Sequence, residues 1–223
     1  MHEERNRKIK ESGKATRERR ANMDCRVFSV KVQENRLSNV KREKLKRCFL
    51  EAKWLYNAIL AAETLTLEDT SSVRVKVKDT FEEREIKSLS VQMKQSVVDS
   101  VKTNISSLSK AKKKGLKVGR LQFKKECNEI NLKQFNKTYK LKSKNKISVQ
   151  NIGVLVVNGL EQISVDEVEF ANAKLVQKPS GYYINITTYS KKQPQFNAEK
   201  EVLGLDMGIK DQLIFSNRVK VNF

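Results

Sequence analysis

The spacing of apolar residues changes twice along this chain, and the two changes limit the folds it can adopt. Residues 25–33 (CRVFSVKVQ) alternate apolar and polar side chains, which is typical of a half-buried β-strand. From Asn39 the apolar residues recur instead at intervals of three and four, which predicts an amphipathic helix with Ser38 as its N-cap. After Gly119 short alternating segments return. A strand, then helices, then many strands predicts an α+β fold, with a helical region inserted into a β-barrel-like domain.

Two helices are expected in the helical region. The apolar face of the first consists of Leu45, Cys48, Phe49, Ala52, Leu55, Tyr56, Ile59 and Leu60. Its opposite face is cationic and carries Lys41, Arg42, Lys44, Lys46 and Arg47. The second helix is expected near residues 89–113, with a buried side formed by Val97 or Val98, Val101, Ile105 and Leu108. Residues 64–87 are polar, and we expect a loop there with a short ribbon at Val73–Val77.

The region after Gly119 is expected to form short strands. The segments LQFKK, INLKQFN, YKLKSKN and KISVQNIGVLVV each predict one or two of them, and residues 168–177 and 182–190 predict a hairpin that turns at Pro179 and Gly181. Aromatic residues lie among the lysines and arginines of this region: Phe123, Phe135, Tyr139, Tyr182, Tyr183 and Tyr189. Such residues either stack on bases or form the buried face of a sheet, and for any single one the buried face is the better explanation.

The net charge indicates the class of partner. The chain carries 46 lysines and arginines against 26 aspartates and glutamates, a net charge of +20. Such an excess repels itself in a compact fold and is usually offset by a polyanion. Nucleic acid is the commonest such partner, and an anionic membrane surface is the main alternative. No apolar run approaches the roughly 18–20 residues of a transmembrane helix, so we expect nucleic acid and no membrane as the partner.

The composition excludes several kinds of chemistry. The three cysteines, Cys25, Cys48 and Cys127, are widely spaced and form no C-x-x-C pair, so we expect neither a zinc site nor a disulfide framework. The single histidine, His2, lies near the N-terminus, which excludes a histidine-based active site. The basic N-terminal sequence lacks the apolar stretch of a signal peptide. We therefore expect a reducing, cytoplasmic location.

Basic residues concentrate in two places. Residues 1–22 form a basic arm, which is either a solvated, frayed or disordered segment or one that folds on phosphates. Residues 110–120 carry more cations than a helix C-terminus requires, which favours phosphate contact over solvation alone. The residues predicted to contact nucleic acid are Lys110, Lys112, Lys113, Lys114, Lys117, Arg120, Lys124, Lys41 and Arg42.

The last segment, VLGLDMGIKDQLIFS, places Asp206 near the end of a short apolar strand and ahead of Gly208. Residues 212–216 are expected to return as a second strand. Three interpretations stay open: an ordinary hairpin whose aspartate caps the turn, the first strand of an RNase H-like nuclease with a metal-binding aspartate, and the phosphate-binding hairpin of actin-like and sugar-kinase ATPases. The position of the hairpin after about 200 residues of basic sequence favours the nuclease.

Residues 89–216 resemble the TnpB family of transposon-encoded RNA-guided nucleases and the related small type V CRISPR effectors. The order of the motifs is similar: the helix VQMKQSVVDSVKTNISSL, a lysine-rich stretch, a G-x-x-x-F-K element from Gly119 to Lys124, paired strands ending in SGYYINI, and GLDMGIKDQLIFS. The last resembles the first RuvC motif of the family, in which Asp206 would be the catalytic, metal-binding aspartate. In pattern, the resemblance extends from about residue 24 to the end.

The resemblance implies a domain organisation and a set of partners. It implies a wedge-type β-barrel at residues 24–37 and 118–196, a helical recognition lobe inserted at 38–117, and the first strands of an RNase H-like RuvC domain at 200–223. Guide RNA and target DNA would be the partners, held mainly through backbone and A-form shape. Mg²⁺ would be the cofactor, and the protein would be associated with the nucleoid. Whether the protein is a monomer or a homodimer is not implied.

The nuclease domain departs from the family pattern. RuvC catalysis in this family needs a second-motif glutamate and a third-motif aspartate, and only seventeen residues follow Asp206. One carboxylate cannot hold two metal ions in register. We therefore expect the chain by itself not to cut DNA, as a fragment or as a truncated relative. The alternative function is a nuclease-incompetent RNA-guided DNA-binding protein or repressor, or a transposon-associated RNA-binding protein.

Overall fold

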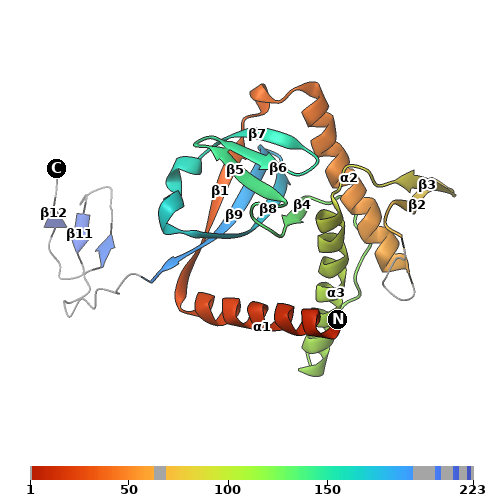
Figure 1. Ribbon diagram of the computed structural model, residues 1–223, viewed down its shortest axis with the longest axis horizontal. Coiled ribbons are helices and arrows are strands. Elements are labelled where there is room, and N and C mark those ends of the chain that lie inside the picture. The colour runs from red at the N-terminus through yellow and green to blue at the C-terminus, as the bar shows by residue number, and fades with distance from the viewer. Residues whose placement is uncertain (1, 63–68, 193–203, 207–212, 216–219, 222–223) are drawn as a thin grey trace. The chain divides into compact units, whose positions relative to one another are not determined.

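The computed structural model describes residues 2–62, 69–192, 204–206, 213–215 and 220–221. The chain divides into two compact units, residues 1–191 and 192–223. The described residues of the first unit form a mixed α+β fold, with three helices and a large antiparallel sheet (Figure 1). The predicted α+β class is therefore confirmed at this level.

The main sheet contains seven strands in the order β4-β8-β9-β1-β7-β6-β5. Their bounds are β1 Met23–Val32, β4 Glu129–Leu132, β5 Tyr139–Ser143, β6 Lys146–Val149, β7 Gly153–Asn158, β8 Glu169–Lys178 and β9 Gly181–Lys191. Every neighbouring pair is antiparallel, and the sheet curls into a nearly closed, barrel-like form (Figure 1). Short 3₁₀ helices follow β1 and β7: η1 Glu34–Arg36, η2 Leu160–Gln162 and η3 Val165–Glu167.

The hairpin of β8 and β9 confirms the prediction from the sequence, and its register shifts once, between Phe170 and Ala173. Lys178 pairs with Gly181, so Pro179 and Ser180 form the turn. Gly181 has φ +117°, a backbone conformation that strains other residues, so glycine is strongly favoured at this position. Because β9 also pairs with β1 along most of its length, this turn fixes the centre of the sheet.

The interior of the sheet is filled by the alternating apolar residues that the sequence predicted. In β1, Val30 and Val32 are buried while Val27 is largely exposed. Opposite strands add Leu155, Leu175, Val157, Ile147, Ile184 and Ile186 to the same core. The period of two therefore sets which side of each strand faces the core.

Two long helices lie between β1 and β4 in the chain, α2 (Asn39–Ala61) and α3 (Val91–Lys113), with a small hairpin of β2 (Ser72–Val77) and β3 (Thr80–Glu85) between them. The Ser38 hydroxyl accepts a hydrogen bond from the Lys41 backbone N–H at 3.4 Å, which confirms Ser38 as the N-cap of α2. Ser90 caps α3 in the same way through the Met93 N–H at 3.3 Å.

The apolar stripe of α2 is buried as expected, apart from the partly exposed Leu60. Helix α3 buries Val97 and Val101, whereas Val98 and Ile105 lie at the edge of the core. These stripes pack α2 against α3 and hold both helices beside β4. The helices thus form one hydrophobic core with the sheet.

A buried carboxylate on α2 fixes the start of α3. Glu51 is 1% exposed and accepts hydrogen bonds from the Ser88 N–H at 2.7 Å, the Ser88 hydroxyl at 3.0 Å and the Leu89 N–H at 3.3 Å. The Arg47 guanidinium adds an ion pair at 3.0 Å. Because a buried charge is tolerated only when it is paired and hydrogen-bonded, this network holds residues 88–89 in one place.

One expectation for the connecting segments was wrong, and one was confirmed. The alternating segment LQFKK (121–125) forms no strand, because its backbone finds no partner strand and hydrogen-bonds instead to a helix side chain described below. The ribbon expected at Val73–Val77 is present as β2, which pairs with β3 in a hairpin. Residues 63–68 lie outside the described residues.

The N-terminal arm is a helix, α1 (His2–Ala21), which leads directly into β1. Its last turn is attached to the sheet, where Arg19 and Arg20 pair with Glu169 at 2.5 and 2.6 Å. The Arg20 guanidinium also lies 4.6 Å from the centroid of the Tyr189 ring. These contacts make the end of the arm an integral part of the first unit.

In the second unit the described residues form a three-stranded antiparallel sheet in the order β10-β11-β12. The strands are β10 Leu205–Asp206, β11 Leu213–Phe215 and β12 Lys220–Val221. Leu205 pairs with Phe215 and Asp206 pairs with Ile214, so the predicted hairpin is present in backbone pairing. Val202, Leu203 and the turn between the strands lie outside the described residues.

Candidate nucleic-acid interface

A strongly basic segment covers the C-terminal half of α3 and the residues that follow it. Residues 100–125, which we call the basic run, contain no aspartate or glutamate. Their cations are Lys102, Lys110, Lys112, Lys113, Lys114, Lys117, Arg120, Lys124 and Lys125. Within the part of the chain that the structure describes, none of these cations forms an ion pair. Their charges are therefore left for a partner outside the chain.

The local sequence explains how the basic run leaves the helix. Gly115 has φ +77°, its N–H donates to the Lys112 carbonyl at 3.0 Å, and the Leu116 N–H donates to the Ala111 carbonyl at 3.2 Å. This is the Schellman arrangement, which ends a helix and turns the chain away. The lysines of the last turn suit the negative end of the helix dipole. There are more lysines here than the interaction with the helix dipole requires.

An asparagine on α2 fixes the far end of the basic run. The Lys124 N–H donates to Asn57 Oδ1 at 2.8 Å, and Asn57 Nδ2 donates to the Lys124 carbonyl at 2.9 Å. The Lys124 ammonium lies 4.2 Å from the centroid of the Tyr56 ring. This double hydrogen bond replaces the strand pairing that the sequence predicted, and it holds residues 123–125 against α2.

One aromatic residue of the basic run is exposed. Phe123 is 63% exposed and stands between Arg120 and Lys124 in the sequence. The aromatics Phe135, Tyr139 and Tyr182 instead belong to the core or pack against it. An exposed aromatic ring among unpaired cations is the combination that contacts both bases and phosphates of a single strand.

Lys41 and Arg42 have a different role from the other predicted contacts. The Lys41 ammonium donates to the Val154 carbonyl at 2.6 Å, and the Arg42 guanidinium donates to the Glu34 carbonyl. Both residues are partly buried and fasten the first turns of α2 to the neighbouring strands and loop. Lys41 lies 16 residues before Asn57, roughly 24 Å along the helix axis at ~1.5 Å per residue. The structure therefore does not bring these two residues together with the basic run.

Sequence reasoning missed three residues that belong to this surface: Asn57, Lys53 and Lys125. Asn57 was detectable as an amide next to the apolar stripe of α2, but its partner is 67 residues away. Lys125 follows Lys124 directly, and Lys53 lies on α2 one turn before Asn57. These residues extend the basic surface from the end of α3 to the middle of α2.

The two buried thiols are not reactive groups of this surface. Burial and, to a smaller extent, the nearby carboxylate of Glu51 together raise the pKa of Cys48 to about 12. Burial likewise raises the pKa of Cys127. Both thiols therefore stay protonated at neutral pH, and the core-packing role predicted for Cys48 agrees with its 1% exposure.

Asp206 ends the described part of strand β10, and its side chain lies outside the described residues. Among the side chains that the structure describes, no three of His, Cys, Asp or Glu gather into a possible metal site. The described residues alone therefore do not fit a two-metal centre, and no step of phosphodiester hydrolysis is derived from them.

No protein-family model matches this chain, and no curated protein is significantly similar to it. None of the helices in the described ranges is long and apolar enough to cross a membrane.

Proposed function

We propose that this chain is the guide-RNA-binding portion of an RNA-guided DNA endonuclease of the TnpB type. The observation that carries the proposal is the basic run, in which unpaired cations and an exposed phenylalanine lie along the end of α3 and the segment after it. Nucleic acid supplies both the phosphates and the planar bases that such a surface needs. An anionic membrane surface would offer phosphates but nothing for Phe123 to stack on.

The topology supports the proposed division of labour. Helices α2 and α3 lie between β1 and β4 in the chain, as the proposed recognition lobe at 38–117 requires. The barrel-like sheet is assembled from β1 and from the strands after residue 128, as the proposed wedge domain requires. In this arrangement the basic run lies where the lobe returns to the barrel, so one RNA would contact both.

The second unit supports the nuclease part of the proposal in a limited way. An antiparallel β10-β11-β12 sheet, with Asp206 at the end of its first strand, agrees with the first strands of an RNase H-like domain. In the proposal Asp206 is one ligand of Mg²⁺ and the remaining carboxylates come from other residues. Mg²⁺ would supply the charge stabilisation for phosphodiester hydrolysis.

RNA retention tests the proposal most simply. The chain is expressed beside its native flanking DNA, purified at moderate salt and treated with ribonuclease. We expect one discrete protected RNA, whose sequence maps next to the gene. A heterogeneous set of RNAs, all released by a small rise in salt, would contradict the proposal and leave only non-specific binding by the net charge.

Catalysis requires a separate test with the complete protein. Cleavage of a guide-matched DNA duplex in the presence of Mg²⁺ should disappear with Asp206→Ala, whereas RNA retention should not change. Undiminished cleavage by the variant would remove Asp206 from the catalytic site. Stable binding of guide and target without any cleavage by the unaltered protein would assign a binding function alone.

A further inference from the structure

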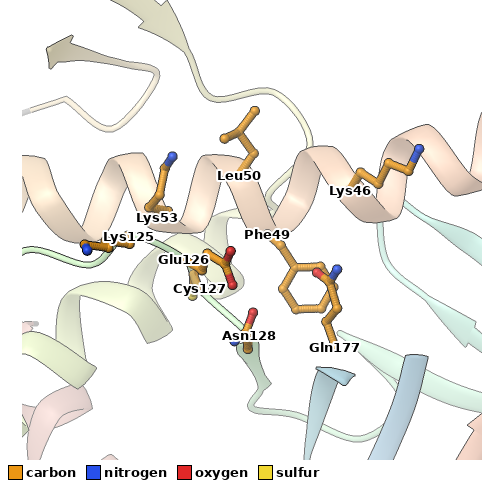
Figure 2. A pocket seen from close by; sticks show the side chains of 9 residues that line it. All are labelled: Lys46, Phe49, Leu50, Lys53, Lys125, Glu126, Cys127, Asn128 and Gln177. Atoms are coloured by element: carbon orange, nitrogen blue, oxygen red, sulfur yellow. The ribbon is translucent and has the colours of Figure 1, made fainter. Parts of the chain in front are cut away.

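A small hollow lies between α2 and the segment that connects the basic run to β4 (Figure 2). Its volume is about 260 Å³. In Figure 2, Phe49 extends from α2 toward Gln177, while Glu126 and Asn128 face α2 from the opposite segment. Cations from both walls line the hollow: Lys46, Lys53 and Lys125.

The floor of the hollow is fixed by contacts within the protein. Phe49 is 4% exposed and its ring stacks on Tyr182, with centroids 6.0 Å apart and planes 16° apart. The Gln177 N–H donates to the Asn128 carbonyl at 2.9 Å, which ties the connecting segment to β8. Cys127 is 7% exposed and its thiol donates to the Glu129 carbonyl at 3.3 Å. The hollow is thus formed before any ligand arrives.

Several polar groups that line the hollow have no partner within the described residues. Among the described residues, neither the side-chain amide of Asn128 nor that of Gln177 makes a hydrogen bond, and Lys53 and Lys125 form no ion pair. Lys46 pairs with Glu43 at 3.0 Å on the exposed side of α2. Each amide offers both donors and an acceptor, the combination that matches the edge of a nucleobase.

We propose that this hollow binds a single unpaired nucleotide. The apolar side chains of Phe49 and Cys127 suit a planar heterocycle, and the two amides suit its polar edge. Lys53 and Lys125 would hold the phosphate. The volume lies just below the range of about 300–1,000 Å³ for small-molecule pockets, which fits one nucleotide rather than a stacked pair.

The basic run identifies the source of the nucleotide. Lys125 directly follows Lys124, whose backbone Asn57 holds against α2, so an RNA strand along the basic run reaches the hollow. This assignment rests on the proposed RNA-binding function. The nucleotide would be one that the RNA does not pair, because pairing occupies the Watson–Crick edge of a base and stacking in the helix keeps it out of the hollow.

Titration with the four ribonucleoside 5′-monophosphates tests the site without RNA. We expect the side-chain amide resonances of Asn128 and Gln177 to shift with millimolar affinity for at least one of them. The variant Asn128→Ala/Gln177→Ala should bind at least tenfold more weakly. Gln150→Ala, which removes an exposed amide outside the hollow, should bind within twofold of the unaltered chain. No shift with any nucleotide, or full binding by the double variant, would overturn the proposal.

Chemical probing of the retained RNA distinguishes the source. One base should be protected in the complex of the unaltered chain and become reactive with Asn128→Ala/Gln177→Ala, while protection elsewhere persists. Lys53→Gln/Lys125→Gln should also expose that base. If every base of the RNA reacted equally in the complexes of the unaltered chain and of the variants, the RNA would not be the source of the bound nucleotide. Mononucleotide binding by a chain that retains no RNA would uphold the site while contradicting the proposed function.

Discussion

Helix α1 and the basic run are both rich in lysine and arginine, but their cations are in opposite situations. In α1, Lys8 pairs with Glu4 at 3.1 Å, Arg7 with Glu11 at 3.7 Å and Lys14 with Glu18 at 3.8 Å, each one helical turn apart. The basic run has no acidic residue at all. Intrahelical pairs of this kind support a polar helix, whereas unpaired cations repel one another until a polyanion binds.

The difference shows that a count of basic residues does not locate an interface. Both regions would score equally as clusters of cations, yet one is partly neutralised by its own glutamates and attached to the sheet through Glu169. The other carries free charge together with an exposed aromatic ring. We therefore expect the binding of nucleic acid to depend mainly on the basic run and only weakly on α1.

The largest effect is expected on stability, when the buried carboxylate that holds the start of α3 is removed. Glu51→Ala leaves the buried N–H groups of Ser88 and Leu89 without acceptors at the start of α3. The free energy of unfolding should fall by about 3 kcal/mol, measured by urea denaturation. Glu43→Ala on the exposed side of α2 should change it by less than about 0.5 kcal/mol. Equal effects of the two variants would contradict the role given to Glu51.

The second-largest effect is expected on RNA binding, when unpaired lysines of the basic run are replaced by glutamine. In Lys112→Gln/Lys113→Gln/Lys114→Gln the slope of log K against log salt should become less negative by about 2, because three phosphate contacts are lost. RNA binding should weaken roughly hundredfold at 0.1 M salt.

The matched change in α1 is Arg7→Gln/Lys8→Gln/Lys14→Gln, which removes cations that already have acidic partners. Filter binding across a salt series should show a loss of RNA affinity several times smaller than that of the triple variant in the basic run. A larger loss of RNA affinity from the α1 variant than from the basic-run variant would contradict the contrast drawn between the two regions.

A smaller effect is expected from the exposed ring of the basic run. Phe123→Ala should weaken RNA binding about tenfold, since stacking of one base on an aromatic ring contributes about 1–3 kcal/mol. Phe81 on β3 is almost equally exposed, at 61%, and serves as the control. Phe81→Ala should leave RNA affinity unchanged in the same titration. Equal losses would mean that neither ring stacks on a base.

The smallest effect concerns the attachment of α1. Partial burial alone would raise the pKa of Glu169, but the hydrogen bonds from Arg19 and Arg20 outweigh it and lower the pKa below its ordinary 4.5. A lowered pKa stabilises the folded state above about pH 4.5, and this contribution is lost as the pH falls through the folded value.

Hydrogen exchange in the last turn of α1 should therefore accelerate, relative to neighbouring amides, as the pH falls below the ordinary pKa of 4.5 and through the lowered folded value. Glu169→Gln should show the faster exchange at neutral pH and little further change on acidification. An unaltered pH profile in that variant would show that another group controls the attachment.

The sequence predicted features whose causes are local. The N-cap at Ser38, the stripe of α2 and the turn at Gly181 follow from periodicity and turn chemistry within a few residues. The Glu51 and Asn57 networks were not predictable in this way, because their partners lie 37 and 67 residues away. The segment 121–125 has the alternation of a strand but no strand beside it, so the pattern alone gave the wrong structure.

The candidate interface was predicted in part. Lys110, Lys112, Lys113 and Lys114 were identified from their density, and they remain free of ion pairs within the described chain. Lys41 and Arg42 were predicted from the cationic face of α2, but their hydrogen bonds to Val154 and Glu34 hold α2 in place. Helical periodicity reports which face of a helix is polar, and it does not report which of those polar groups find partners elsewhere in the fold.

Ultraviolet crosslinking of the retained RNA, followed by identification of the crosslinked peptides, tests the contrast between the two basic regions most directly. Crosslinks are expected in the basic run, above all at Phe123 and its neighbours, and in the α2 peptide that contains Lys53. Few are expected in residues 4–18 of α1. Crosslinks confined to α1, with none in the basic run, would contradict the assignment of the interface to the basic run.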